Sequence, residues 1–109
     1  MQLFSEVFKL YSYKNKDRCD LSIKVNNELV LTFKLTHDEL SKILSGEAEF
    51  NSSTGSFWYV TKKKKFECFR ITVHAAGVDF NFRVSYNDFE KLGNDYKTQM
   101  SNPMPWDNK

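Results

Sequence analysis

Hydrophobic residues occupy alternate positions in two well-separated stretches of the chain, residues 29–35 and 78–84. The positions between them are largely polar, for example Asp79, Asn81 and Arg83. Because successive side chains of a β-strand point to opposite faces, this spacing predicts two strands with one buried face each. Alternation, or a concentration of aromatic and β-branched residues, predicts further strands at 6–13, 21–25, 47–51, 56–61 and 69–73.

Each of the two alternating strands is followed by a signal for a short helix. Thr36 stands three residues before Glu39, and Ser85 stands three residues before Asp88. A hydroxyl followed at this distance by an acidic side chain is typical of a capping box, although aspartate fits the exchange less well than glutamate. Hydrophobic residues at helical spacing follow both signals, which predicts two short helices, the first of them ending at Gly46.

The C-terminal part of the chain contains residues that interrupt helices. Gly93 is expected either to end the second helix or to bend it, with helical structure resuming over 96–100. Residues 101–109 contain both prolines of the chain, so we expect an irregular tail there. Met104 and Trp106 are the side chains that would pin this tail to the body; the alternative is a loose tail.

The two strand-and-helix stretches resemble each other in sequence. Residues 29–43 and 78–92, which lie at an offset of 49 positions, match identically or conservatively at most positions, including Phe33 with Phe82. We interpret this match as an internal duplication, rather than as a chance likeness between two amphipathic segments. The expected fold is α+β, with two tandem strand-strand-(strand)-helix repeats that form one mainly antiparallel sheet of about six strands packed against two short helices.

The length of the chain suits a single domain. Its 109 residues are 40% hydrophobic and 16% aromatic, which is enough for a modest core and too apolar for a disordered chain. We expect this domain over residues 1–100, with one half at about 6–46 and the other at about 56–100. Neither a membrane-length apolar run nor a signal peptide is visible, and two cysteines are too few for a disulfide framework. We therefore expect a small soluble protein of the cytoplasm.

The net charge is only +2, but positive charge is concentrated in two segments that follow the first strand of each half. In a pseudo-twofold arrangement, two equivalent basic turns fall on one edge and attract phosphate groups. Aromatic residues flank both segments, and flat rings beside cations suit stacked bases. The alternative is that the lysines only solvate two turns and protect strand edges. The candidate binding residues are Lys14, Lys16, Arg18, Lys62, Lys63, Lys64, Lys65 and Arg70, with Tyr13 and Trp58 as stacking candidates.

Catalytic chemistry finds little support in the sequence. The two histidines, His37 and His74, form no recognisable arrangement with a nucleophile, and His37 is expected to be exposed and passive in the first turn of a helix. Together with Cys19 and Cys68 they show none of the usual zinc-ligand spacings. No glycine-rich phosphate loop is present in the sequence. We therefore expect a non-enzymatic binding protein without a cofactor or a metal.

Single-stranded nucleic acid, DNA or RNA, is the partner that basic turns with neighbouring aromatic residues favour. The tandem order of strands and helix is loosely similar to that of PUR-repeat and whirly proteins, which bind single-stranded nucleic acid. The alternative is a small protein-binding inhibitor or adaptor of the kind carried by phages and mobile elements, such as an anti-CRISPR protein, whose target would be a nucleic-acid-processing protein.

Two surfaces leave further possibilities open. A strand at the edge of a sheet pairs readily with another chain, so the stretches 6–13 and 56–61 are candidates for homodimer formation. The outward side of the stretch 66–74 is mixed in character, and we expect it either to bind a partner or to be covered by the C-terminal tail. Its residues are Phe66, Cys68, Arg70, Thr72 and His74.

Overall fold

The computed structural model describes residues 2–3, 6–25 and 29–108, which form two β-sheets and two α-helices. The three-stranded sheet is an antiparallel meander of β2 (Glu6–Tyr13), β3 (Arg18–Val25) and β4 (Leu29–Leu35). The five-stranded sheet has the order β1-β8-β7-β6-β5, with β1 parallel to β8 and the other neighbours antiparallel. Its strands are β1 (Gln2–Leu3), β5 (Ala48–Asn51), β6 (Phe57–Lys63), β7 (Cys68–Ala75) and β8 (Val78–Ser85).

Both predicted helices form, and their N-terminal caps explain where they begin. Helix α1 (His37–Leu44) opens with a complete capping box. The backbone nitrogen of Glu39 donates to Thr36 Oγ1 at 3.1 Å, and the backbone nitrogen of Thr36 donates to Glu39 Oε1 at 2.8 Å. At helix α2 (Tyr86–Ser101), the backbone nitrogen of Asp88 donates to Ser85 Oγ at 3.1 Å. The cap residues read from the sequence are confirmed at both helices.

Helix α2 continues past Gly93 without a break. The expectation that this glycine ends the helix, with helical structure resuming over 96–100, was therefore wrong. A glycine inside a helix costs about 1 kcal/mol relative to alanine, which is too little to end a helix whose apolar side is buried. Phe89 and Leu92 provide that buried side, and Gln99 is buried farther along the helix.

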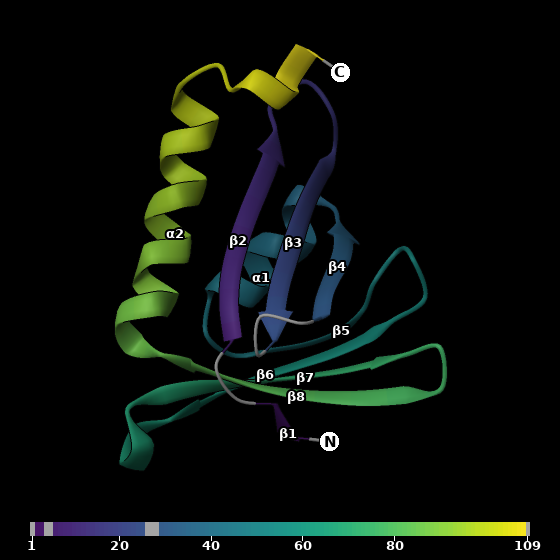
Figure 1. Cartoon of the computed structure of the whole chain (residues 1–109), viewed down its shortest axis with the longest axis vertical. Helices are drawn as coiled ribbons and strands as arrows, with labels where there is room; N and C mark the ends of the chain where they lie inside the picture. The colour runs from purple at the N-terminus through teal and green to yellow at the C-terminus, as the bar shows by residue number, and fades with distance from the viewer. Residues whose placement is uncertain (1, 4–5, 26–28, 109) are drawn as a thin grey trace.

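The two sheets are separate, so the expected single sheet of about six strands was wrong. Figure 1 shows the strands of the three-stranded sheet running upright, whereas those of the five-stranded sheet run across beneath them. Hydrophobic alternation tells which side of a strand is buried, but it carries no information on which strand lies beside it. Each half of the chain does order three antiparallel strands before a capped helix. The proposed duplication itself stays a prediction.

The core lies between the two sheets and the two helices. Trp58 of β6 is fully buried, and its ring contacts Phe33 of β4 edge-on at 5.1 Å and stacks on Phe50 of β5 at 6.2 Å between ring centroids. Its indole nitrogen donates to Ser56 Oγ at 3.0 Å, so its polar atom is satisfied inside the core. The two sheets also meet where Phe8 of β2 contacts Phe82 of β8 edge-on at 6.2 Å. Residues from both halves of the chain therefore share one core.

Helix α2 lies along one edge of the three-stranded sheet, beside β2 (Figure 1). Gln99 on this helix is buried and bonds directly to the backbone of that strand. The second edge expected from the sequence, residues 56–61, is no edge, because β6 pairs with β5 on one side and with β7 on the other. That second expectation was wrong.

The C-terminal residues lie against β2 and the turn that follows it. A short 3-10 helix, η2 (Pro105–Asn108), holds the indole nitrogen of Trp106 at 2.8 Å from the carbonyl oxygen of Ser12. The same ring contacts Tyr11 edge-on at 5.1 Å. The tail therefore does not cover the outward side of β7, which was one of the two alternatives expected for that surface. No helix among the described residues is long and apolar enough to cross a membrane.

Candidate nucleic-acid interface

The five-stranded sheet has one face in the core and one face turned away from it. Figure 1 shows both helices and the three-stranded sheet on the same side of strands β5 to β8. We call the opposite side the outer face. Its side chains include cationic, acidic, aromatic and small polar groups, and strand parity together with exposure assigns them to this face. They are Glu49, Phe57, Tyr59, Thr61, Lys63, Cys68, Arg70, Thr72, His74, Asp79, Asn81 and Arg83.

Two arginines lie directly opposite each other on this face. Arg70 of β7 pairs with Arg83 of β8 in the strand register, and both side chains are exposed. Like charges at directly opposed positions on neighbouring strands repel each other, so this part of the outer face concentrates positive charge. The two arginines line a hollow of about 160 Å³ together with Lys63, Phe66 and Cys68, which we call the cationic pocket.

The aromatic wall of the cationic pocket comes from the bend between β6 and β7. This bend contains the 3-10 turn η1 (Lys64–Phe66), and the ring of Phe66 is 62% exposed. The guanidinium carbon of Arg83 lies 5.7 Å from the centre of that ring, within the range of a cation–π contact. Glu67 ends the turn in the left-handed conformation, with φ of 51°, and directs the chain into β7. The bend thereby places an exposed ring beside two arginines.

The second basic segment of the sequence belongs to this region. Lys64 and Lys65 lie on the exposed bend, and Lys63 lines the cationic pocket. Lys62 is turned the other way, with its ammonium group 5.3 Å from the centre of the Tyr86 ring at the start of α2. Arg70, which the sequence also singled out, lies within the same pocket.

The first basic segment lies elsewhere. The turn between β2 and β3 is near the C-terminus, whereas the bend between β6 and β7 is at the opposite end of the molecule (Figure 1). The expectation that two equivalent turns fall on one edge and form one patch was therefore wrong. The turns belong to two different sheets whose strands run in different directions. Turns that occupy equivalent places in the sequence therefore lie in different parts of the molecule.

Residues of the first segment already have partners within the chain. The guanidinium group of Arg18 forms two hydrogen bonds with the carboxylate of Asp20, both at 2.9 Å. Arg18 also lies 4.9 Å from the centre of the Tyr13 ring, and the ammonium group of Lys16 lies 5.6 Å from it. The backbone nitrogen of Lys14 donates to Asp107 of the tail at 2.7 Å. These contacts hold the turn together, which gives the segment a structural role.

Trp58 is not a stacking platform, because its side chain is fully buried. The exposed aromatic residue of β6 is its neighbour Tyr59, which is 44% exposed on the outer face. Strand parity contained the signal. Trp58 shares its face of the strand with Val60, whereas Tyr59 shares the opposite face with Thr61 and Lys63. Sequence reasoning missed Tyr59, and it also missed Arg83, whose place opposite Arg70 depends on strand pairing.

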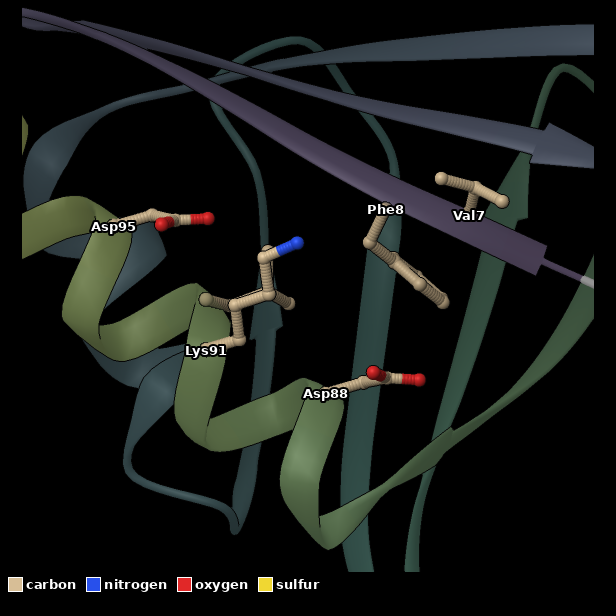
Figure 2. A pocket seen from close by; sticks show the side chains of 6 residues that line it. Val7, Phe8, Asp88, Lys91 and Asp95 are labelled. Atoms are coloured by element: carbon tan, nitrogen blue, oxygen red, sulfur yellow. The ribbon is translucent and has the colours of Figure 1, made fainter.

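A second hollow lies between β2 and α2 and has a different character. Figure 2 shows Asp88, Lys91 and Asp95 projecting from the helix beside Val7 and Phe8 of the strand. The two carboxylates are separated by seven residues of helix, roughly 10 Å along its axis, which is too far for them to share a proton or a ligand atom. Two carboxylates against one ammonium group leave this lining net negative, which disfavours phosphate, so the groove is not part of the candidate interface.

His37 is half-buried and takes part in several hydrogen bonds, so the expectation of an exposed, passive histidine was wrong. Its Nε2 lies 2.8 Å from the carbonyl oxygens of Tyr13 and Lys16, and it must therefore carry a proton and donate. Its Nδ1 lies 3.0 Å from the hydroxyl of Tyr96 and 3.2 Å from Cys19 Sγ. The histidine thereby ties the β2–β3 turn to both helices.

The cysteines do not assemble a metal centre. Cys19 is fully buried beside His37, whereas Cys68 lies on the other sheet, in the cationic pocket. Within the described part of the chain, no three His, Cys, Asp or Glu side chains are grouped so that they could hold a metal ion. Burial raises the pKa of the Cys19 thiol to about 11, so this thiol is protonated at neutral pH.

Comparisons with protein-family models, with curated proteins and with solved structures found no match for this chain. The arrangement of charge and aromatic side chains on the outer face is therefore the basis for assigning a function.

Proposed function

We propose that the chain binds single-stranded nucleic acid on the outer face of the five-stranded sheet. The observation that carries this proposal is the opposed pair Arg70 and Arg83, with the exposed ring of Phe66 beside it. Both arginines donate to phosphate oxygens, and the ring provides a surface on which a base stacks. Lys64 and Lys65 on the adjoining bend extend the positive charge beyond the pocket.

The arrangement of these groups favours a single strand over a duplex. Phe66 exposes aromatic surface beside the arginines, and Tyr59 exposes aromatic surface farther along the sheet, in a hollow that Glu47 and Glu49 also line. Bases reach such rings only when they are unstacked and unpaired. A duplex presents phosphates but keeps the faces of its bases inside the stack. Binding through this face is therefore expected to combine phosphate contacts, which weaken with salt, and base stacking, which is less sensitive to salt.

The test is the binding of a fluorescent single-stranded oligonucleotide at two salt concentrations. The double variant Arg70→Gln with Arg83→Gln should bind at least about tenfold more weakly at low salt, because two charge-assisted contacts are lost. The slope of log K against log salt should fall by about 1.4, since each single-strand phosphate contact contributes about 0.7. Lys14→Gln with Lys16→Gln removes the same charge at the opposite end of the molecule and should bind like the wild-type protein.

Two outcomes contradict the proposal. One is an absence of oligonucleotide binding at low salt by a folded wild-type protein. The other is an equal loss of affinity in both double variants, which would mean that only net charge matters. Circular dichroism spectra of all variants should overlay, because the four substituted side chains are exposed.

The alternative function, a protein-binding inhibitor or adaptor, is favoured by a different surface. On the outward side of the three-stranded sheet, Val7 and Val30 are 48% and 58% exposed and flank Lys24 in the strand register. Tyr11 and Lys9 line the same shallow hollow. Exposed apolar side chains with a charged rim are typical of protein-binding surfaces. Val7→Ser with Val30→Ser should abolish capture of a stoichiometric protein partner and leave oligonucleotide binding unchanged if this surface is the functional one.

A further inference from the structure

We infer that two copies of this chain associate through the β4 edge of the three-stranded sheet. The two β4 strands pair antiparallel about a twofold axis, so that the two meanders form one continuous sheet. This inference concerns a different sheet from the one that carries the cationic pocket, and it does not depend on the proposed function.

The outer edge of β4 is open. Strand β3 pairs with one side of β4 over all of Leu29–Leu35. Among the described residues, no strand pairs with the other side, and no backbone hydrogen bond joins it to a turn or loop. Figure 1 shows β4 on the side of the sheet that is remote from α2, the helix that lies along β2. The β4 edge is therefore where this sheet can accept another strand.

Strand β4 lacks the features that usually protect an exposed edge. Its residues pair one-to-one with β3, so it has no bulge, and it contains no proline. Lys34 is its one charged residue, and the apolar side chain of Val30 is 58% exposed. A regular, largely apolar edge of this length pairs readily with another chain. The edge is therefore an interaction surface.

The sequence of β4 is complementary to itself in the antiparallel direction. The register centred on Thr32 is the one that pairs all seven residues of both strands. In this register Thr32 lies opposite Thr32 of the second copy, and Val30 lies opposite Lys34, so the two lysines do not oppose each other. On the core side, Leu31 lies opposite Phe33. Cross-strand neighbours stabilise a sheet by packing, whereas like charges directly opposite each other destabilise it.

Space for the second strand is available beside β4. A hollow of about 320 Å³ is lined by Thr32, Phe33 and Lys34 of β4 and by small residues of two hairpins, Thr54, Gly55, Ser56, Ala75 and Ala76. The ring of Phe33 packs against the core but is only partly buried. Leu31 of the second copy, opposite Phe33 on the core side, enters this hollow and covers the exposed part of the ring.

The first experiment measures the mass of the protein by sedimentation equilibrium over a wide range of concentration. A single strand pair is a small interface, so the wild-type protein should show a dimer that dissociates on dilution. Val30→Lys should dimerise at least about tenfold more weakly than Val30→Glu, because position 30 lies opposite Lys34 twice in each interface. Val7→Lys adds the same charge to the same face, but on β2, and should dimerise like the wild-type protein.

The second experiment tests the register with cysteines in a Cys68→Ser background. Thr32→Cys places two thiols at facing positions, with β-carbons about 4.5 Å apart at the closest, which a disulfide can span. This variant should therefore form a covalent dimer under mild oxidation. Val30→Cys should not, because the corresponding cysteine of the second copy lies four residues farther along the strand, roughly 14 Å away.

Three outcomes would overturn the inference. The first is a folded wild-type protein that stays monomeric at every concentration. The second is equal weakening by Val30→Lys and Val7→Lys, which would mean that only net charge matters. The third is as much disulfide in Val30→Cys as in Thr32→Cys. Circular dichroism spectra of these variants should overlay that of the wild-type protein, because the side chains at positions 7, 30 and 32 are exposed.

Discussion

The side-chain oxygen of Gln99 accepts a hydrogen bond from the backbone nitrogen of Ser12 at 2.7 Å, across 87 positions of sequence. The amide nitrogen of the same side chain donates to the carbonyl oxygen of Leu10 at 2.7 Å. Helix α2 thereby supplies β2 with the two contacts that a neighbouring strand would otherwise make. This arrangement blocks the pairing of a second chain with this part of the β2 edge.

Replacing Gln99 with leucine should destabilise the protein by about 2–4 kcal/mol, because a buried N–H and a buried C=O each lose their partner. Urea unfolding followed by circular dichroism measures this loss. Lys97→Ala, at an exposed position of the same helix, should change the stability by less than about 0.5 kcal/mol. A similar small effect of Gln99→Leu would mean that the two backbone groups find other partners.

The docking of the C-terminal tail should depend on pH and weaken in acid. The carboxylate of Asp107 accepts hydrogen bonds from the backbone nitrogens of Lys14 and Met104, which lowers its pKa from the ordinary value of 3.8. Because the folded pKa is the lower one, the stabilisation is complete above about pH 4 and is lost as the pH falls through the lowered value. The indole N–H resonance of Trp106 should report release of the tail in that range.

Asp107→Asn provides the control for this titration. It removes the charge and keeps the side chain nearly the same size, so the tail should dock more weakly at neutral pH and lose its acid dependence. A wild-type indole resonance that does not change between pH 5 and pH 2 while the protein stays folded would contradict the assigned role of Asp107.

Cys19 should be inert in the folded protein. Burial raises the pKa of its thiol to about 11, from an ordinary value of 9.0, so the thiolate is scarce at pH 8. Since the folded pKa is the higher one, the associated stability is complete below about pH 9 and declines as the pH rises toward 11. In a Cys68→Ser background, Cys19 should react with a thiol reagent only after urea unfolds the chain; rapid labelling of native protein would refute this.

Replacing each of two glycines with alanine should change the stability of the protein in opposite directions. Gly46 has a φ of +89°, and a β-carbon built there would lie 2.8 Å from Cε1 of Phe69, so Gly46→Ala should cost at least about 1–2 kcal/mol. Gly93 lies inside α2 with open space around it, so Gly93→Ala should stabilise the protein by about 0.5–1 kcal/mol. Thermal unfolding of the two variants checks both signs.

Substitutions at Trp58 and at Tyr59 should have different effects, the first on stability and the second on oligonucleotide affinity. Trp58→Ala removes a buried ring and should cost about 3–5 kcal/mol of stability. Tyr59→Ala should leave the stability nearly unchanged and weaken oligonucleotide binding, because a stacked base is worth about 1–3 kcal/mol. Titrations with the oligonucleotide, together with unfolding curves, distinguish the two. Full oligonucleotide affinity in Tyr59→Ala would exclude this residue from the interface.

Local spacing along the chain was sufficient to locate every described strand except β1, the caps and the apolar sides of the helices. The strand at 29–35 and the capping box of Thr36 with Glu39 lie where alternation and hydroxyl-to-acid spacing put them. The second basic segment and Arg70 were also recognisable as surface groups. These features depend on backbone geometry over a few residues, and such geometry is encoded in neighbouring positions.

The tertiary structure decided what depends on distant pairing. It divided the strands between two sheets, and it buried Trp58 while exposing Tyr59. It also placed Arg83 opposite Arg70, and it put the first basic turn at the opposite end of the molecule from the bend between β6 and β7. Alternation states only that a strand has an apolar side. Which strand lies beside it, and which way each sheet turns, follows from how all the apolar sides close over one core.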